Sequence, residues 1–159
     1  MNRLFVSLLA TTLLVSCNSS KKATASRVGT VPLYNYYVKN DVALPDEYNH
    51  RVLVDASSFD AFAGTDATMT NQVQRPDFNG QVVVAVAARP SRTWQDLRIT
   101  GATIGGREMN VYYTASKGET KTFNTTAVAL ATVTRAKGVN TVNFYRDSVL
   151  TGTATVKIP

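Results

Sequence analysis

The pattern of apolar and polar residues changes character twice along the chain. Residues 4–15 are almost continuously apolar, residues 18–31 are polar without any periodicity, and from Leu33 onward apolar residues recur at the spacing of strands. An apolar helix of that length rises about 18 Å, which is well short of the roughly 30 Å hydrocarbon core of a membrane. The pattern therefore predicts three parts: a leader over 1–16, a flexible tether over 17–32 and one folded domain over 33–159.

Within the folded part, runs of β-branched and aromatic residues are separated by turn-forming residues. Strands are predicted over residues 33–38, 51–55, 81–88, 94–104, 109–115, 127–135, 141–147 and 153–158. The polar stretches 116–125 and 148–152 are predicted as a connection and a turn. One short helix is expected after Ser57, which would be its N-cap, with Phe59, Phe62 and Ala63 on one face.

Two of these strands carry the most information about packing. Residues 82–88 are all apolar and rich in valine, so this strand is expected to be covered on both faces. In the next predicted strand, Leu97 and Ile99 point to one side, and Trp94 and Arg98 point to the other. Matching apolar faces requires Ile99 to pair with Tyr113, which a three-residue loop over 105–107 would provide.

The order of these elements predicts the fold class. About eight short strands and one short helix, without regular alternation of strand and helix, are typical of a mainly β protein. We expect an antiparallel sandwich or a partly open barrel.

The only cysteine of the chain closes the apolar leader. Leu14, Val15 and Ser16 immediately before Cys17 closely resemble the lipobox of bacterial lipoproteins. This resemblance implies cleavage before Cys17, a diacylglycerol on its sulfur, and attachment to membrane lipid in the cell envelope. Because Asn18 stands where lipoproteins of the inner membrane often carry aspartate, it favours the outer membrane, facing the periplasm or the surface. The alternative is an ordinary signal peptide with an incidental cysteine.

Composition and charge narrow the classes of partner. The chain of 159 residues has 17 Lys and Arg against 11 Asp and Glu, and losing Arg3 with the leader would leave a net charge of +5. Export would remove nucleic acid as a partner, which leaves anionic headgroups, envelope glycans or an acidic protein surface. A well-solvated surface is the alternative explanation. Acylation of Cys17 would leave no free thiol for disulfides, thiolate catalysis or metal binding.

Few residues suggest catalysis or a cofactor. His50 is the only histidine, so no imidazole cluster can bind zinc, and we expect neither metal nor cofactor. His50, Asp55 and Ser57 contain the side-chain types of a catalytic triad, but their close spacing along one strand does not suit a relay. Asp46 and Glu47 are adjacent in a predicted loop, where we expect them to face solvent. The chain is therefore predicted not to be an enzyme.

A group of arginine and aromatic residues is the strongest candidate for a binding surface. Strict alternation places Trp94 on the outer face with Arg98, and the group also includes Arg89, Arg92 and Tyr112. Exposed tryptophan and arginine are typical of binding hot spots. The alternative is that a bulge turns Trp94 into the core.

The order of motifs between residues 52 and 135 is similar to a known family. Ser58, Phe59 and Phe62 in a short helix precede Pro76-Asp77-Phe78, a valine-rich strand and the turn Arg89 to Trp94. Together they resemble the C-terminal domain of the PrcB-like lipoproteins, which are accessory proteins of a bacterial surface protease complex. Family members tend to have Gly-Gly-Tyr where this chain has Arg92-Thr93-Trp94, so the departure falls in the turn itself while an aromatic residue is kept.

This resemblance implies a non-catalytic lipoprotein that binds or stabilises another protein of the envelope, such as a protease complex. Two alternatives stay open. In the first alternative, the chain is a protease inhibitor that presents the loop from Arg89 to Trp94. In the second, it is a module that binds envelope glycan.

Overall fold

The computed structural model describes residues 24–66 and 73–158, and these form a mainly β fold with a single short helix. The predicted leader and the lipobox cysteine lie outside the described residues. The elements are β1 (Ser26–Val28), β2 (Thr30–Leu33), β3 (Tyr36–Val38), β4 (Tyr48–Leu53), α1 (Ala56–Phe62), β5 (Ala63–Thr65), β6 (Gln81–Ala88), β7 (Ser91–Gly105), β8 (Glu108–Thr125), β9 (Val128–Thr134), β10 (Thr141–Arg146) and β11 (Val149–Thr155).

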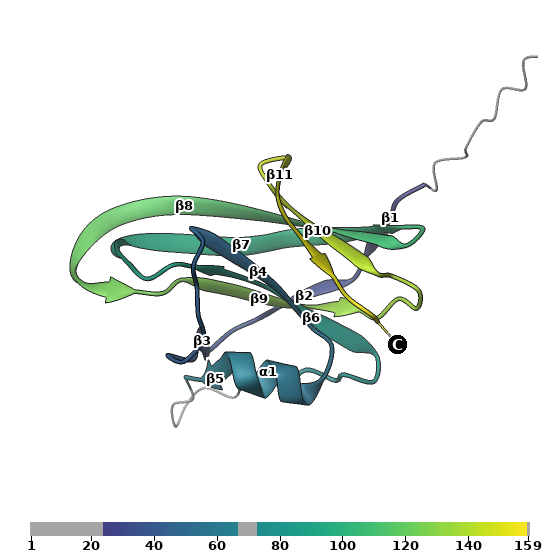
Figure 1. Cartoon of the computed structure of the whole chain (residues 1–159), viewed down its shortest axis with the longest axis horizontal. Helices are drawn as coiled ribbons and strands as arrows, with labels where there is room; N and C mark the ends of the chain where they lie inside the picture. The colour runs from purple at the N-terminus through teal and green to yellow at the C-terminus, as the bar shows by residue number, and fades with distance from the viewer. Residues whose placement is uncertain (1–23, 67–72, 159) are drawn as a thin grey trace, which may run out of the picture.

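The strands form two large sheets and one small sheet. One sheet has the order β1-β7-β8-β10-β11, the second has the order β2-β9-β6-β4, and β3 pairs with β5. Figure 1 shows α1, β3 and β5 together on one side of the second sheet, while β7 and β8 form a long curved ribbon on its other side. The predicted mainly β class is confirmed, and the sheets do not close into a barrel, which is consistent with the sandwich of the two predicted forms.

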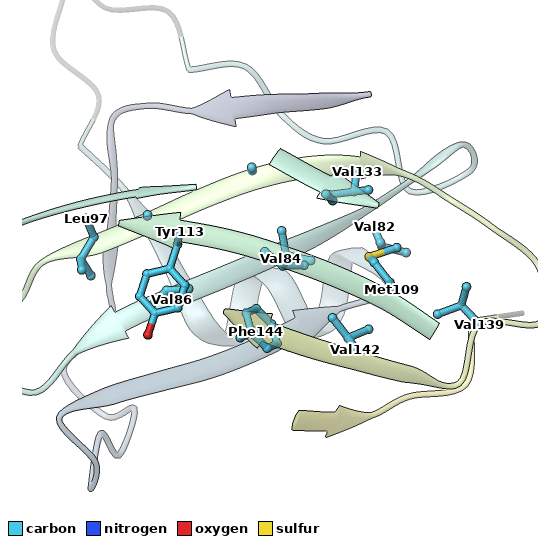
Figure 2. Packing of buried hydrophobic residues seen from close by; sticks show 14 of the residues in the cluster. Val82, Val84, Val86, Leu97, Met109, Tyr113, Val133, Val139, Val142 and Phe144 are labelled. Carbon is cyan, nitrogen blue, oxygen red and sulfur yellow. The ribbon is translucent and has the colours of Figure 1, made fainter. Parts of the chain in front are cut away.

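Strand β6 lies at the centre of the molecule because both of its faces are covered. Its valines Val82, Val84 and Val86 pack between the two large sheets, whereas Val83, Ala85 and Ala87 pack against α1 and β3. All of these side chains are fully buried, as predicted for the valine-rich run. Figure 2 shows side chains of both large sheets turned toward one another around Val84, with Met109 and Phe144 from the facing sheet.

The β7–β8 hairpin confirms the predicted register but not the predicted loop. Ile99 pairs with Tyr113, while at the end of the hairpin Gly105 pairs with Glu108 across a two-residue turn. Gly106 has a φ of 62°, which a turn of this length requires at its first central position. A bulge after Ile99 shifts the register by one residue and reconciles the two pairings.

The helix α1 begins two residues earlier than predicted. Its N-cap is Asp55, whose carboxylate accepts a hydrogen bond of 2.7 Å from the Ser58 backbone N–H. Ser58 completes the capping box from the other side, so Ser57 is not the cap. The predicted apolar face is confirmed, since Phe59 and Phe62 are buried against β6 and β3.

The prediction of a tether up to residue 32 is wrong for its last part. Residues 26–28 pair with β7, and residues 30–33 pair with β9. Both are edge strands held by backbone hydrogen bonds, which need no apolar periodicity in the side chains. The predicted strand 33–38 is also divided, because Asn35 adopts a φ of 63° that interrupts the extended backbone.

Three predictions in the C-terminal half need correction. Residues 116–125 continue β8 as a strand instead of forming a connection. The turn after β10 is confined to Asp147 and Ser148, which both have positive φ, so β11 begins at Val149 and not at residue 153. The predicted antiparallel arrangement also has one exception, since β10 runs parallel to β8: the chain crosses to the other sheet in β9 before it returns.

Candidate functional site

The structure divides the five predicted binding residues among three places. Arg92, Trp94 and Arg98 alternate with inward residues of β7 and lie on its outer face. Tyr112 lies on β8 near the opposite end of the hairpin, and Arg89 precedes β7 on the side of the inward residues. The five candidate residues therefore do not form one compact surface, whereas the predicted placement of Trp94 and Arg98 on one face is found.

Trp94 is held in a defined position although it is exposed. Its side chain is 45% exposed, so the alternative in which a bulge buries it is excluded. The indole lies over Gly118 of β8, where a Cβ atom would come within 2.9 Å of the tryptophan Cε3. The missing side chain at Gly118 therefore provides the space in which the indole rests on the ribbon.

Charged side chains flank Trp94 on the same outer face. Arg98 forms a salt bridge of 2.8 Å with Asp96, and Lys121 forms one of 3.6 Å with Glu119. Among the described residues, Arg92 has no salt bridge and is exposed. We call the group Arg92, Trp94 and Arg98 the Trp94 surface.

Tyr112 belongs to a separate aromatic patch. Its ring stacks on Tyr145 of β10 with the centroids 5.6 Å apart, and its hydroxyl lies 3.4 Å from Thr103 Oγ1. Tyr112 pairs with Gly101, which is seven residues from Trp94 and therefore about 23 Å away along an extended strand. One small ligand cannot contact both aromatic residues.

Arg89 borders a polar pocket on the inward side of β7. The pocket has a volume of about 360 Å³ and is lined by Glu47, Arg89, Ser91, Thr93, Gln95 and Lys117. The backbone N–H of Arg89 donates to the Glu47 carbonyl over 3.1 Å, and β7 begins two residues later. The segment from Arg89 to Trp94 is thus mostly strand, and the prediction of a presented loop is wrong.

A larger pocket, which the sequence did not predict, lies where the edge strands β4 and β11 face each other. It has a volume of about 540 Å³ and is bordered by residues 45–51 of the β4 segment, Arg146, and residues 151–153 of β11. The Arg146 guanidinium lies 5.0 Å from the centroid of the Tyr48 ring. Such stacking leaves the edge of the guanidinium free for a planar anion.

His50 closes the inner wall of this pocket and connects the two sheets. Its ring packs on Phe144 with centroids 4.7 Å apart, and its Nε2 lies 3.2 Å from the Tyr113 hydroxyl and 3.3 Å from Thr151 Oγ1. Gly152 allows this close packing, since a Cβ there would lie only 2.4 Å from His50 Nδ1. Burial lowers the pKa of His50, which the Asp46 carboxylate partly opposes.

The residues around His50 do not form a catalytic relay. Asp55 serves as the helix cap, and the hydroxyls near His50 are those of Tyr113 and Thr151, the latter donating to the Phe144 carbonyl over 3.0 Å. Within residues 24–66 and 73–158 there is no group of three or more His, Cys, Asp or Glu side chains placed to hold a metal ion.

The comparisons with known proteins leave the site to be interpreted from its geometry. No family model, curated protein or solved structure matches the chain. In the part of the chain that the structure describes, no helix has the length and apolar character needed to cross a membrane.

Proposed function

We propose that the protein is a non-catalytic lipoprotein of the bacterial cell envelope, anchored through acylated Cys17, that binds or stabilises a partner protein through the Trp94 surface. The order of motifs resembling PrcB-like lipoproteins makes a protease complex the first partner to test. The lipobox sequence before Cys17 supports the membrane anchor, because two or three acyl chains on one residue would make attachment effectively permanent.

The observation that carries this proposal is an exposed tryptophan between arginines, held on a strand. Trp94 is 45% exposed and is positioned by Gly118, so little conformational freedom remains to be lost on binding. Tryptophan and arginine contribute disproportionately to protein interfaces. An inhibitor that inserts a loop from Arg89 to Trp94 has less support, because most of this segment is paired in β7.

Crosslinking of the full, affinity-tagged chain in its native host tests the partner. We expect one envelope protein to be recovered repeatedly with the wild-type chain and to be lost with the Arg92→Ala, Trp94→Ala double variant. Tyr37→Ala is the matched control, because Tyr37 is also an exposed aromatic residue packed over a glycine, Gly64, but it lies on β3 on the other side of the molecule. Equal recovery with both variants, or recovery of cell-wall material alone, would refute the proposal.

The anchor is tested separately. In the Cys17→Ala variant we expect loss of incorporation of an alkyne-labelled fatty acid and release of the protein from sedimented membranes. Ser19→Ala, two residues further along the chain, is the control and should leave both unchanged. Membrane sedimentation of Cys17→Ala at the wild-type level would show that the lipid anchor is not the attachment.

A further inference from the structure

The two pockets described above meet at Glu47, which borders both of them. We call the two adjoining pockets together the Glu47 groove. It lies at the open side of the sandwich and faces away from the Trp94 surface, since Gln95 and Lys117 line it from the inward side of the same ribbon that carries Trp94 outward. A ligand in the groove would therefore not compete directly with one on the Trp94 surface.

The charges in the groove are unbalanced. Glu47 forms a salt bridge of 3.0 Å with Lys117, and Arg89 and Arg146 also border the groove. Neither arginine has a salt bridge among the described residues. The pKa of Glu47 is lowered chiefly by its hydrogen bond from Lys117, with smaller contributions from the charges of Arg146 and Arg89. Asp46 and Arg51 also border the groove, which therefore holds two carboxylates among four cations, and the surplus positive charge favours a further anion.

The groove is also bordered by backbone that can pair with an extended chain. Strand β4 is the edge of its sheet and pairs only with β6 among the described strands. Because the Glu47 carbonyl bonds to Arg89 of the β6 side, alternation directs the N–H and C=O groups of Tyr48 and His50 toward the free edge. Gln95 also lines the groove, and its Oε1 is buried without a hydrogen-bond partner.

We propose that the Glu47 groove binds an acidic polypeptide segment in an extended conformation, which pairs with the free edge of β4 and places carboxylates against Arg89 and Arg146. Main-chain pairing at a sheet edge supplies affinity, and the flanking arginines select the charge of the segment. This binding is separate from the partner surface proposed above and does not depend on it.

The test measures fluorescence anisotropy of the full chain in detergent with a labelled ten-residue peptide of alternating glutamate and valine. We expect saturable binding, no binding of the same peptide with glutamine in place of glutamate, and affinity reduced about tenfold or more by Arg89→Gln with Arg146→Gln. The matched control is Arg107→Gln with Lys137→Gln, which removes two exposed charges at the far end of the hairpin and should change affinity less than about twofold.

A variant that is expected to increase affinity distinguishes a specific loss of binding from misfolding. Glu47→Gln removes one of the two carboxylates of the groove and leaves Lys117 without its salt bridge, so this variant should bind the acidic peptide several-fold more tightly. Equal losses in both double variants, or no tightening with Glu47→Gln, would overturn the proposal. Methylation of alternate peptide nitrogens should abolish binding. If it does not, and a polymer of glucuronate displaces the peptide, the groove binds an anionic glycan and the proposal is wrong.

Discussion

The two halves of strand β8 show how one strand can serve two purposes. In the first half, Met109, Val111 and Tyr113 point into the space between the large sheets and are at most 1% exposed. In the second half, every residue from 116 to 124 is exposed, although the backbone continues to pair with β7. The same hairpin is therefore part of the core at one end and a ribbon solvated on both faces at the other.

This difference separates the stability of the fold from its candidate binding surfaces. The second half contributes Gly118, on which Trp94 rests, and Lys117, which holds Glu47. Because residues 116–124 are all exposed, the loss of these contacts should cost less folding free energy than the loss of a core side chain. Substitutions in the first half should therefore unfold the protein, and those in the second half should alter recognition.

The largest expected difference is between Met109→Ala and Phe123→Ala. Met109 is fully buried, so truncating it should reduce the free energy of unfolding by about 2–5 kcal/mol. Phe123 is 63% exposed in the second half, and its truncation should change the free energy of unfolding by less than about 0.5 kcal/mol. Urea denaturation followed by circular dichroism measures both. Similar losses would mean that the second half also packs against the core.

A smaller loss is expected from Gly152→Ala, beside the buried half of β8. The added methyl group would overlap the His50 ring, which is confined by Phe144 and the Tyr113 hydroxyl, and such overpacking costs about 1–3 kcal/mol. Gly101→Ala is the control, because a Cβ there meets no atom within 4 Å and its φ is not positive. A Gly152→Ala variant as stable as Gly101→Ala would contradict the close contact between β11 and His50.

The stability contributed by His50 should depend on pH. Burial lowers the pKa of His50 in the folded protein below the ordinary value of 6.5. At a pH between the pKa of the folded protein and that of the unfolded chain, the unfolded chain therefore binds more protons. Stability should therefore fall as the pH is lowered below about 6.5, before the carboxylates titrate. His50→Gln should remove this slope. If the midpoint of urea denaturation for the wild-type chain is the same at pH 7 and pH 5.5, His50 is not desolvated as described.

The sequence predicted the elements whose side chains meet the core and missed those that only the backbone holds in place. The valine-rich run over 82–88 has no polar residue, so its coverage on both faces could be inferred directly. Residues 26–32 and 116–125 carry no apolar periodicity because little of either segment faces the core. Their strand pairing depends on neighbouring backbone that is distant in sequence, which no local pattern reveals.

The candidate site residues were also predicted correctly only where their placement depends on a single strand. Alternation placed Trp94 and Arg98 on the outer face correctly, since it depends only on the strand itself. The candidate group also included Tyr112 and Arg89, which lie elsewhere, because the length of the strands and the side on which Arg89 leaves β6 cannot be read from local spacing. The contacts of His50 with Tyr113 and Thr151 join residues 63 and 101 positions apart, so only the tertiary structure could show them.

The smallest expected change in stability, and the most direct test of the second half of β8, is Gly118→Val. The new side chain would occupy the place of the Trp94 indole and displace it toward solvent, because the atoms nearest to a Cβ at Gly118 all belong to the Trp94 side chain. Trp94 is the only tryptophan of the chain, so its displacement should appear as a red shift of the fluorescence emission and stronger quenching by iodide. Gly101→Val should leave the emission unchanged. If Gly118→Val shifts the emission but partner recovery in the crosslinking experiment stays at the wild-type level, then Gly118 positions Trp94, but this position is not needed for partner binding.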